Sequence, residues 1–310
     1  MNYDIIGDIH GQAEKLIKLL EKLGYKKQNN IYQQEERQVV FVGDFIDRGK
    51  HQQQVIDIVR PMIENNKAVA VMGNHEFNAI CYHTKTTEIP SGYLRNHKEK
   101  NTKQHAAFLN EYPVGDDKTE ELIQWFKTLP LFLELDEFRV VHACWDQHII
   151  DKLTPKLTQD NCLMEEYYLD ASLEGNDVYE FVEVLLKGKE MSLPDGISFH
   201  DKDGNERHEI RIKWWERSLK TYQQASVLNI PGLNNSPDIN IPQKDMNKGY
   251  PSDDKAVFFG HYWFTGTPKA ISNNVACLDY SAAKEGPLVA YCWDKQNVQH
   301  ISNNAFIQSD

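Results

Sequence analysis

The sequence contains few cysteines, and none of them is paired in a recognisable motif. Five cysteines are spread singly over 310 residues, and no Cys-x-x-Cys pair occurs. An odd number of scattered cysteines argues against both a disulfide framework and a structural zinc site, and it fits a protein of the reducing cytoplasm.

Long apolar runs and an excess of positive charge are also missing. No uncharged apolar run approaches the ~20 residues that span a bilayer, and residues 1–6 lack the basic and apolar pattern of a secretory signal. We therefore expect a soluble, cytoplasmic protein without a membrane partner. The net charge of -12 argues against binding of extended nucleic acid. It leaves a phosphorylated substrate open, because bound metal ions can reverse the local field.

The sequence contains enough apolar residues for a large core, and their spacing predicts alternating strands and helices. Apolar residues make up 40% of the chain. Their spacing predicts strands at 3–7, 39–43 and 68–72, with helices at 12–23 and 52–65 between them. This alternation is typical of an α/β fold with parallel crossovers, in which ligands bind at the carboxyl ends of the strands.

The rest of the chain is less regular. We expect a polar surface excursion at 25–38 and a solvated, weakly basic surface within 84–118 that includes Arg95 and His105. A patch that steers phosphate is the alternative for this basic stretch. A further helix is predicted at 117–128, another at 213–225, and a long loop at 231–254. Strands are predicted at 131–135, 138–142 and 256–260, with last strands at 275–279, 288–293 and 298–301 that close a second sheet. We expect one domain over 1–310, with an acidic insertion at 146–255 that serves as a lid or a specificity region.

Side chains able to bind metal ions follow five of the predicted strands. Four of them come directly after an apolar run and a glycine (Asp8, Asp44, Asn74 and His261), and His142 follows a strand without the glycine. His10 lies two residues after Asp8, so in an extended segment both would point the same way. A lone Asp or His of this kind is usually a turn or structural residue. Five together indicate a metal site.

This candidate ligand set has oxygen and nitrogen donors and no sulfur, which suits Mn²⁺, Fe or Zn²⁺. Six protein ligands are too many for one catalytic ion, and they divide naturally over two ions about 3.5–4 Å apart that share one carboxylate. We therefore expect two divalent metal ions, with Mn²⁺ as the first choice and Fe, Zn²⁺ or Mg²⁺ as alternatives.

The motifs around these residues are Gly7-Asp8-Ile9-His10-Gly11, Gly43-Asp44-Phe45-Ile46-Asp47-Arg48-Gly49, Gly73-Asn74-His75-Glu76, His142 and Gly260-His261. Together they resemble the motifs of the calcineurin-like metallophosphoesterases, in their phosphoprotein-phosphatase branch. The opening segment is most similar to bacterial phosphatases that also cleave dinucleoside tetraphosphates. The resemblance implies a four-layer αββα sandwich of two mixed sheets flanked by helices.

The resemblance also implies a role for each site residue. Asp8, His10 and Asp44 would hold the first ion, and Asp44 would bridge to a second ion held by Asn74, His142 and His261. A bridging hydroxide would attack phosphorus in line. The implied catalytic and substrate-binding residues are His75 as the general acid, Asp47 as the carboxylate that orients it, and Arg48 and Asn74 at the phosphate.

Two positions depart from the family pattern. Many phosphodiesterase branches place another histidine two residues after the Gly-His motif, where this chain has Trp263. That difference favours the phosphatase branch. The second phosphate-binding arginine of the family would be Arg211, with Arg217 as the alternative. A structural role, in which the arginine packs beside Trp214 or Trp215, explains it nearly as well.

Three functions follow as hypotheses. The first is hydrolysis of phosphomonoesters, including phosphoproteins, by a metal-dependent phosphatase. The second is hydrolysis of dinucleoside polyphosphates at the same site. The third, a non-catalytic scaffold, conflicts with the presence of the ligands, the acid and the arginine together.

Overall fold

The computed structural model describes residues 1–200, 206–230, 240–242, 248–295 and 300–310. The chain divides into two compact units: unit 1 holds Met1–Leu186 and Lys255–Asp310, and unit 2 holds Lys187–Asp254. The insertion predicted at 146–255 is thus larger than unit 2, because residues 146–186 belong to unit 1. Its role as a lid stays a prediction.

The first sheet of unit 1 has five strands in the order β15-β14-β1-β4-β5. Its strands are β1 (Asn2–Ile6), β4 (Arg37–Phe41), β5 (Ala68–Ala70), β14 (Val289–Trp293) and β15 (Phe306–Gln308). The first three run parallel, with Ile6 opposite Phe41 and Phe41 opposite Ala70. Their carboxyl ends therefore meet at one edge of the sheet.

The second sheet of unit 1 has four strands in the order β13-β12-β7-β6. Its strands are β6 (Phe132–Glu134), β7 (Phe138–Val141), β12 (Ala256–Phe259) and β13 (Val275–Cys277). β12 runs parallel to both of its neighbours, with Phe258 opposite Val140 and opposite Ala276. The ends of β7 and β12 therefore also lie together.

Between the two sheets lies a core that contains side chains from both. The ring of Tyr3 on β1 meets that of Phe138 on β7 edge to face at 5.3 Å, and Phe258 on β12 lies 4.9 Å from Tyr291 on β14. All but Tyr3 are buried members of one apolar cluster, and Tyr3 packs against it. Burial of this kind is the main favourable term in folding, and here it holds the sheets face to face.

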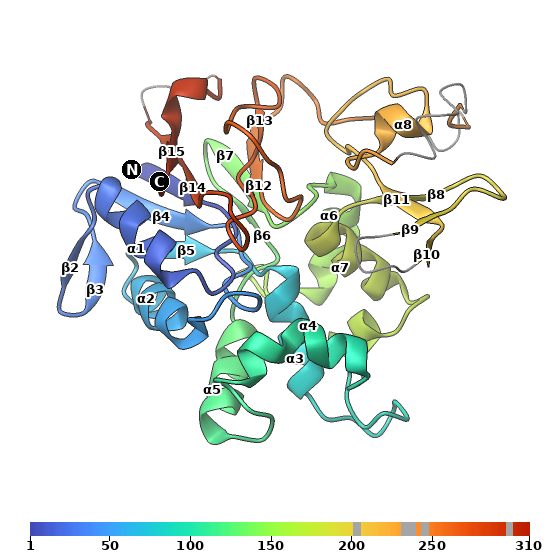
Figure 1. The fold of residues 1–310 in the computed structure, drawn as a ribbon, viewed down its shortest axis with the longest axis horizontal. Helices are drawn as coiled ribbons and strands as arrows, with labels where there is room; N and C mark the ends of the chain where they lie inside the picture. Colours follow the sequence, from blue (N-terminus) through green and yellow to red (C-terminus); the bar gives the residue numbers. More distant parts are fainter. Residues whose placement is uncertain (201–205, 231–239, 243–247, 296–299) are drawn as a thin grey trace. The chain divides into compact units, whose positions relative to one another are not determined.

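Seven α-helices lie around the sandwich in the described residues of unit 1. They are α1 (Ala13–Lys22), α2 (Gln52–Glu64), α3 (Asn74–His83), α4 (Glu99–Leu109), α5 (Asp117–Phe126), α6 (Gln147–Leu153) and α7 (Asp177–Lys187), the last of which ends at the unit boundary. Helices α1 and α2 lie beside the first sheet, and α6 and α7 lie beside the second (Figure 1). The predicted four-layer α/β sandwich is confirmed.

Some predicted elements differ from the structure. The strand predicted at 288–293 forms, but it pairs with β1 in the first sheet and not in the second. An apolar run predicts a strand without naming its partner, so this pairing could not be read locally. The excursion at 25–38 contains a hairpin of β2 (Lys26–Gln28) and β3 (Ile31–Gln33), and the 84–118 region contains α4. The last strand is β15 and not 298–301, of which 298 and 299 lie outside the described residues.

The described residues of unit 2 form two short antiparallel pairs of strands and one short helix. β8 (Glu190–Ser192) pairs with β11 (Glu209–Arg211), β9 (Phe199–His200) pairs with β10 (Glu206–Arg207), and α8 spans Tyr222–Ala225. The helix predicted at 213–225 is therefore wrong over most of its length. Ser218 has a φ of 62°, which interrupts a right-handed helix, and Thr221 caps the short helix through the amide of Gln224.

Both tryptophans of unit 2 that the sequence singled out are buried beside aromatic neighbours. Trp214 meets Trp215 at 5.8 Å and Tyr250 at 5.9 Å, in both cases edge to face. Much of the loop predicted at 231–254 lies outside the described residues. Among the helices that the structure describes, none has the length and apolar character needed to cross a bilayer.

Candidate metal centre

The candidate ligands follow the carboxyl ends of five strands of unit 1, three in the first sheet and two in the second. Asp8 follows β1, Asp44 follows β4, Asn74 follows β5, His142 follows β7, and His261 follows β12. All five side chains are buried, as is that of His10. The strand ends of two facing sheets thus deliver the predicted ligand types to one region.

Two glycines allow this convergence, because a side chain at either would collide with a candidate ligand. A Cβ atom on Gly73 would lie 2.2 Å from Oδ1 of Asp44, and one on Gly260 would lie 1.9 Å from Oδ1 of Asp8. The glycines before these ligands therefore make room for carboxylates that follow other strands of the two sheets.

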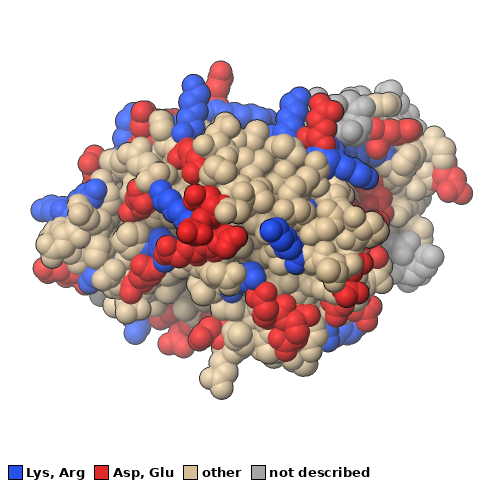
Figure 2. All heavy atoms as spheres, turned by 90° about the horizontal axis from the view of Figure 1, so that it is seen from below, with Lys and Arg blue, Asp and Glu red and all other residues tan. Residues whose placement is uncertain are grey.

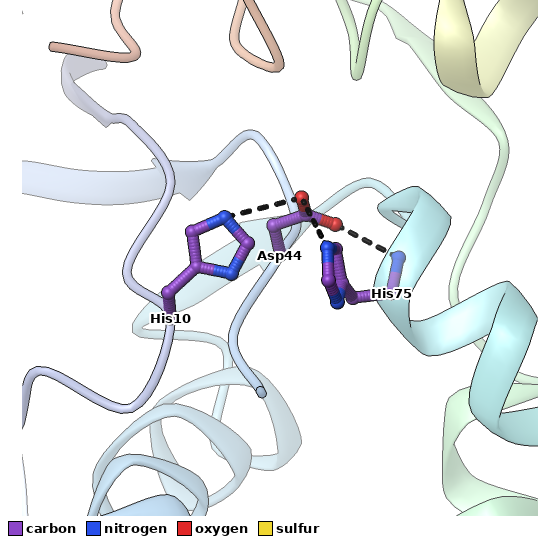
Figure 3. A group of neighbouring side chains, drawn as sticks. All are labelled: His10, Asp44 and His75. Carbon is purple, nitrogen blue, oxygen red and sulfur yellow. Dashed lines mark hydrogen bonds and ion pairs between the residues drawn. The ribbon is translucent and has the colours of Figure 1, made fainter. Parts of the chain in front are cut away.

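Asp44 lies at the centre of the candidate site. Its Oδ2 atom is 3.5 Å from Nε2 of His10, 3.4 Å from Nε2 of His142 and 4.0 Å from Nε2 of His75. Its Oδ1 atom accepts a hydrogen bond from the backbone amide of His75 at 3.0 Å. Figure 3 shows the rings of His10 and His75 on either side of this carboxylate. Two groups of potential ligands share Asp44: one with His10 and His75, the other with His142 and His261.

Asn74 joins the second group through its amide oxygen. Its Oδ1 atom lies 3.1 Å from Nε2 of His142 and 2.8 Å from Nδ1 of His261. Asp8 is adjacent, because its Oδ2 atom accepts a hydrogen bond from the backbone amide of His261 at 2.9 Å. The structure therefore brings all six predicted ligands into one buried neighbourhood around Asp44.

Two of the histidines have their outer ring nitrogen fixed by a backbone carbonyl. Nδ1 of His10 donates to the carbonyl oxygen of Ile46 at 3.0 Å, and Nδ1 of His142 donates to that of Val42 at 2.8 Å. Each ring therefore directs Nε2 toward Asp44. Metal-binding histidines are typically held by such a hydrogen bond on the other ring nitrogen.

Two polar atoms of this site are placed as ligands of a cation would be. Within the described residues, Oδ1 of Asp8 and Nε2 of His10 are buried and make no hydrogen bond. A buried polar atom without a partner costs free energy, and a metal ion would satisfy both a carboxylate and an imidazole nitrogen. The residues present thus fit a divalent ion, and the donor set does not identify which one.

The electrostatics of the cluster also favour a cation. Burial raises the pKa of Asp8, and the charges of Asp279 and Asp44 raise it further. Burial opposes ionisation of Asp44 as well, but His142, His75 and His10 hold its pKa well below the usual value. The pKa of His142 is raised to about 10, because the attraction of Asp44 and Asp8 outweighs burial. Closely spaced carboxylates here draw positive charge inward.

His10 is not in the extended conformation that the sequence suggested. Its φ is 49°, in the left-handed region, within a turn that leads from β1 into α1. The turn is held by the amides of Ile9 and His10, which both donate to the carbonyl oxygen of Asp44. The backbone of the Asp8–His10 segment is therefore fixed by Asp44 and not by strand geometry.

His75 is placed between Asp44 and a second carboxylate. Its Nδ1 atom donates to Oδ2 of Asp47 at 2.5 Å, and the other oxygen of Asp47 accepts from Nδ1 of His105 at 2.8 Å. Asp47 is buried, yet the two histidines hold its pKa well below the usual value. Because Nδ1 of His75 is engaged, only Nε2 faces the Asp44 side, as a general acid requires.

Arg48 and Arg211 lie in different units. Arg48 follows Asp47 in unit 1 and is exposed. Its charge lowers the pKa of His10 and of His75, but this effect is smaller than those of burial and of Asp44. Arg211 is on β11 of unit 2, where its Nε atom lies 3.5 Å from Oε1 of Glu190. A phosphate-binding role for Arg211 stays a prediction, as does the choice between it and the exposed Arg217.

The sequence did not predict the roles of Glu76, His105 and Asp279. Glu76 accepts hydrogen bonds from the backbone amides of Asp44, Phe45 and Gly73, and so ties the second motif to the third. Its pKa is raised to about 7 by burial and then by Asp44. Asp279 accepts from the amides of Trp263 and Ser281.

For one of these residues, Glu76, a signal was present in the sequence. Glu76 ends the Gly73-Asn74-His75-Glu76 motif, so its position in the motif could have indicated a role. The assignment of His105 to a solvated surface is wrong, because its side chain is 5% exposed and hydrogen-bonded to Asp47. No local pattern distinguishes it from the exposed lysines around it.

The comparisons with known proteins agree with this geometry. Residues 1–178 match the family model described as calcineurin-like phosphoesterase. A relative from Oceanobacillus iheyensis, named asymmetrical bis(5'-nucleosyl)-tetraphosphatase PrpE, is 34% identical over 155 residues, which are 49% of this chain and 60% of that protein. A relative of the same name from Anoxybacillus flavithermus is 34% identical over 149 residues, or 46% of this chain and 56% of that one. The matches thus cover less than two thirds of these curated relatives.

One solved structure shows the same fold. The cold-active protein-tyrosine phosphatase of a psychrophilic Shewanella species superposes with a TM-score of 0.53 and 15% sequence identity, covering 100% of this chain and 80% of that one. At this identity the similarity concerns the fold alone.

Proposed function

Because the chain belongs to the calcineurin-like phosphoesterase family, we propose that it is a metal-dependent hydrolase that cleaves dinucleoside polyphosphates asymmetrically. The position of Asp44 is the observation that supports a metal-dependent hydrolase. Asp44 is shared by two groups of potential metal ligands, one of which contains His75. The observation that favours this substrate is the name of the relatives, which are tetraphosphatases described as asymmetrical.

Such a reaction requires residues that hold two metal ions. Asp8, His10 and Asp44 would hold one divalent ion, and Asp44, Asn74, His142 and His261 would hold the other. When bound, such a pair lowers the pKa of water and offsets the negative charge of a phosphate group.

The remaining side chains act on the substrate. The exposed guanidinium of Arg48 binds oxygens of the phosphate that is cleaved, as a planar donor of paired hydrogen bonds, and Asn74 lies at the same phosphate. His75, held at Nδ1 by Asp47, gives a proton from Nε2 to the oxygen that leaves. Water supplies the new bond to phosphorus, so an asymmetrical cleavage of a tetraphosphate yields a nucleoside triphosphate and a nucleoside monophosphate.

The relatives reverse the order of the two substrate hypotheses drawn from the sequence. Hydrolysis of phosphomonoesters came first there, and dinucleoside polyphosphates came second. Phosphomonoesters remain the second candidate, because the metal site and Arg48 bind a single phosphate equally well. Phosphoproteins gain no support from the named relatives.

The charge distribution agrees with a small phosphorylated substrate. Among the described residues on the face shown in Figure 2, Asp and Glu side chains lie between the Lys and Arg side chains. A nucleic-acid backbone is usually bound by a continuous basic surface, which this face does not offer. We further propose Mn²⁺ as the working metal, with which oxygen and nitrogen donors without sulfur are compatible. The scattered cysteines support the cytoplasm as the proposed location.

The test is product analysis with diadenosine tetraphosphate in the presence of Mn²⁺. We expect equal amounts of ATP and AMP from the wild-type chain, and no products from Asp44→Asn, which removes the shared carboxylate. Two molecules of ADP per substrate would overturn the asymmetrical cleavage. Absence of any nucleotide product, together with rapid hydrolysis of p-nitrophenyl phosphate, would establish the phosphomonoester candidate instead.

A further inference from the structure

Two cationic side chains lie over the indole ring of Trp263. The Cζ atom of Arg48 lies 4.6 Å from the ring centroid, and the Nζ atom of Lys284 lies 4.9 Å from it. The same ring stacks against His10, one of the candidate metal ligands, with centroids 5.5 Å apart and planes at 29°. Arg48, Trp263 and Lys284 therefore form a cationic platform that begins at the candidate metal centre.

The platform is built by buried polar contacts and is not a chance meeting of surface chains. Trp263 has a φ of 55°, and its backbone amide donates to Oδ2 of the buried Asp279 at 2.6 Å. The other oxygen of Asp279 accepts from the amide of Ser281 at 2.9 Å, at the start of the loop that carries Lys284. One carboxylate thus fixes both the tryptophan and this loop.

Lys15 on α1 holds the loop from its other side. Its Nζ atom donates to the carbonyl oxygens of Ala282 at 2.8 Å, Lys284 at 3.2 Å and Gly286 at 2.7 Å. The backbone of Lys284 is therefore anchored while its side chain is exposed. A lysine held in this way loses less conformational freedom when it binds a ligand than a freely moving one.

Within the described part of the chain, no carboxylate forms an ion pair with either cation of the platform, Arg48 or Lys284, although Glu285 follows Lys284 directly. Two cations that share one ring repel each other, and an anion between them would relieve that repulsion. The platform thus favours a ligand with several negative charges.

We propose that Lys284, held with Arg48 on the indole of Trp263, forms a subsite for the phosphates of a polyphosphate chain beyond the one that is cleaved. Arg48 engages the phosphate at the metal centre, and Lys284 engages the next phosphates along the chain. The subsite favours substrates with a polyphosphate over phosphomonoesters. This inference rests on the proposed function, since it names the part of a dinucleoside polyphosphate that distinguishes it from a simple ester.

The test compares two nucleotides that share a base and differ in phosphate number. Isothermal titration calorimetry on the full chain with Mn²⁺ would give the dissociation constants of adenosine 5'-(β,γ-methylene)triphosphate and of AMP. We expect the wild type to bind the triphosphate analogue more tightly. In Lys284→Gln the ratio of the two affinities should fall about tenfold, the value of one charged hydrogen bond. Lys284→Arg should keep most of the ratio.

Lys27→Gln is the matched control. It also removes one positive charge and one cation–π contact, since Nζ of Lys27 lies 5.9 Å from the ring centroid of Tyr32. This pair lies in the hairpin of β2 and β3, which leads into the amino end of β4. The candidate metal centre lies after the carboxyl end of β4. The affinity ratio of this variant should equal that of the wild type.

The outcomes separate this inference from the proposed function. An unchanged ratio in Lys284→Gln, an equal fall in Lys27→Gln, or a wild type that binds the two nucleotides equally would overturn the subsite. If the ratio falls as expected but diadenosine tetraphosphate is not cleaved, the subsite stands and the proposed substrate fails. If the tetraphosphate is cleaved and the ratio is unchanged, only the subsite fails.

Discussion

Nδ1 of His105 donates a hydrogen bond of 2.8 Å to Oδ1 of Asp47, the carboxylate whose other oxygen holds His75. Both histidines and the carboxylate are buried. His105 comes from α4, 30 residues after His75 along the chain, and it satisfies the oxygen of Asp47 that His75 does not use. We infer that His105 positions the dyad that would protonate the leaving group.

This relationship predicts a loss of activity that depends on the leaving group. His105→Ala leaves one oxygen of Asp47 without a partner, so the orientation of His75 loosens and kcat should fall about tenfold for phenyl phosphate. The fall should be smaller for p-nitrophenyl phosphate, whose leaving group needs less protonation. His105→Asn places an amide nitrogen near the position of Nδ1 and should restore most of the activity. Equal losses for both substrates, without rescue by Asn, would show that His105 is only structural.

His75 has a second possible role, since its Nε2 atom is one of three potential ligand atoms in the group around Asp44. Because Nδ1 is bound to Asp47 and Nε2 is 4.0 Å from Asp44, we expect His75 to act as the acid and not as a metal ligand. His75→Ala should lower kcat by about 10²- to 10⁴-fold while two metal ions per chain remain. Metal content is measured by mass spectrometry of the purified protein. The matched variant His142→Ala should lose one ion, and an equal loss in His75→Ala would reassign His75 as a ligand.

Most of the candidate metal centre could be predicted from the sequence because its residues lie directly after strand ends. Asp8, Asp44 and Asn74 each come after an apolar strand and a glycine, and parallel strands of one sheet bring their carboxyl ends together. Only local patterns and this rule are needed. That the two sheets face each other, so that His142 and His261 meet Asp44, was implied by the resemblance to a family and not by the patterns.

The parts that could not be predicted depend on contacts distant in sequence. His105 lies in a stretch of charged residues, and only the packing of α4 places it beside Asp47. Lys284 and Arg48 are far apart in the chain, and they meet on Trp263 because Asp279 fixes the backbone on both sides. The pairing of β14 with β1 has the same origin. An amino-acid pattern states what a segment can form, and a long-range contact decides what it lies against.

Glu76 provides a test of how the motifs are held together. Its carboxylate accepts hydrogen bonds from the amides of Phe45 at 2.8 Å, Asp44 at 2.8 Å and Gly73 at 3.0 Å. In Glu76→Gln one acceptor oxygen becomes a donor, so at least one buried amide loses its partner at a cost of about 1–3 kcal/mol. We expect a fall in Tm of several degrees, measured by differential scanning calorimetry. Glu64→Gln, on the exposed end of α2, is the control and should melt near the wild-type temperature. An unchanged Tm in Glu76→Gln would show that these hydrogen bonds contribute little.

From the burial of His83 we predict how the stability of the fold changes with pH. Its Nε2 atom lies 3.3 Å from Nε2 of His105, and within the described residues its buried Nδ1 atom makes no hydrogen bond. Burial, followed by the charges of His105 and His97, lowers the pKa of His83 to about 3, although Asp47 acts in the opposite direction. Below the usual histidine pKa of about 6.5 the unfolded chain takes up a proton that the folded chain does not. Stability should therefore fall as the pH decreases from about 6.5 toward 3.

The measurement is urea unfolding of wild type and His83→Gln at pH 7.5 and pH 5. Gln keeps a donor near the position of Nε2 but does not titrate. Between these two pH values, we expect the wild type to lose about 1 kcal/mol more stability than the variant, after allowance for solvent screening at this half-buried side chain. His148→Gln, at an exposed position of α6, should follow the wild type. If His83→Gln loses as much stability as the wild type on acidification, His83 already carries a proton in the folded chain at pH 5, and its burial does not control the acid sensitivity.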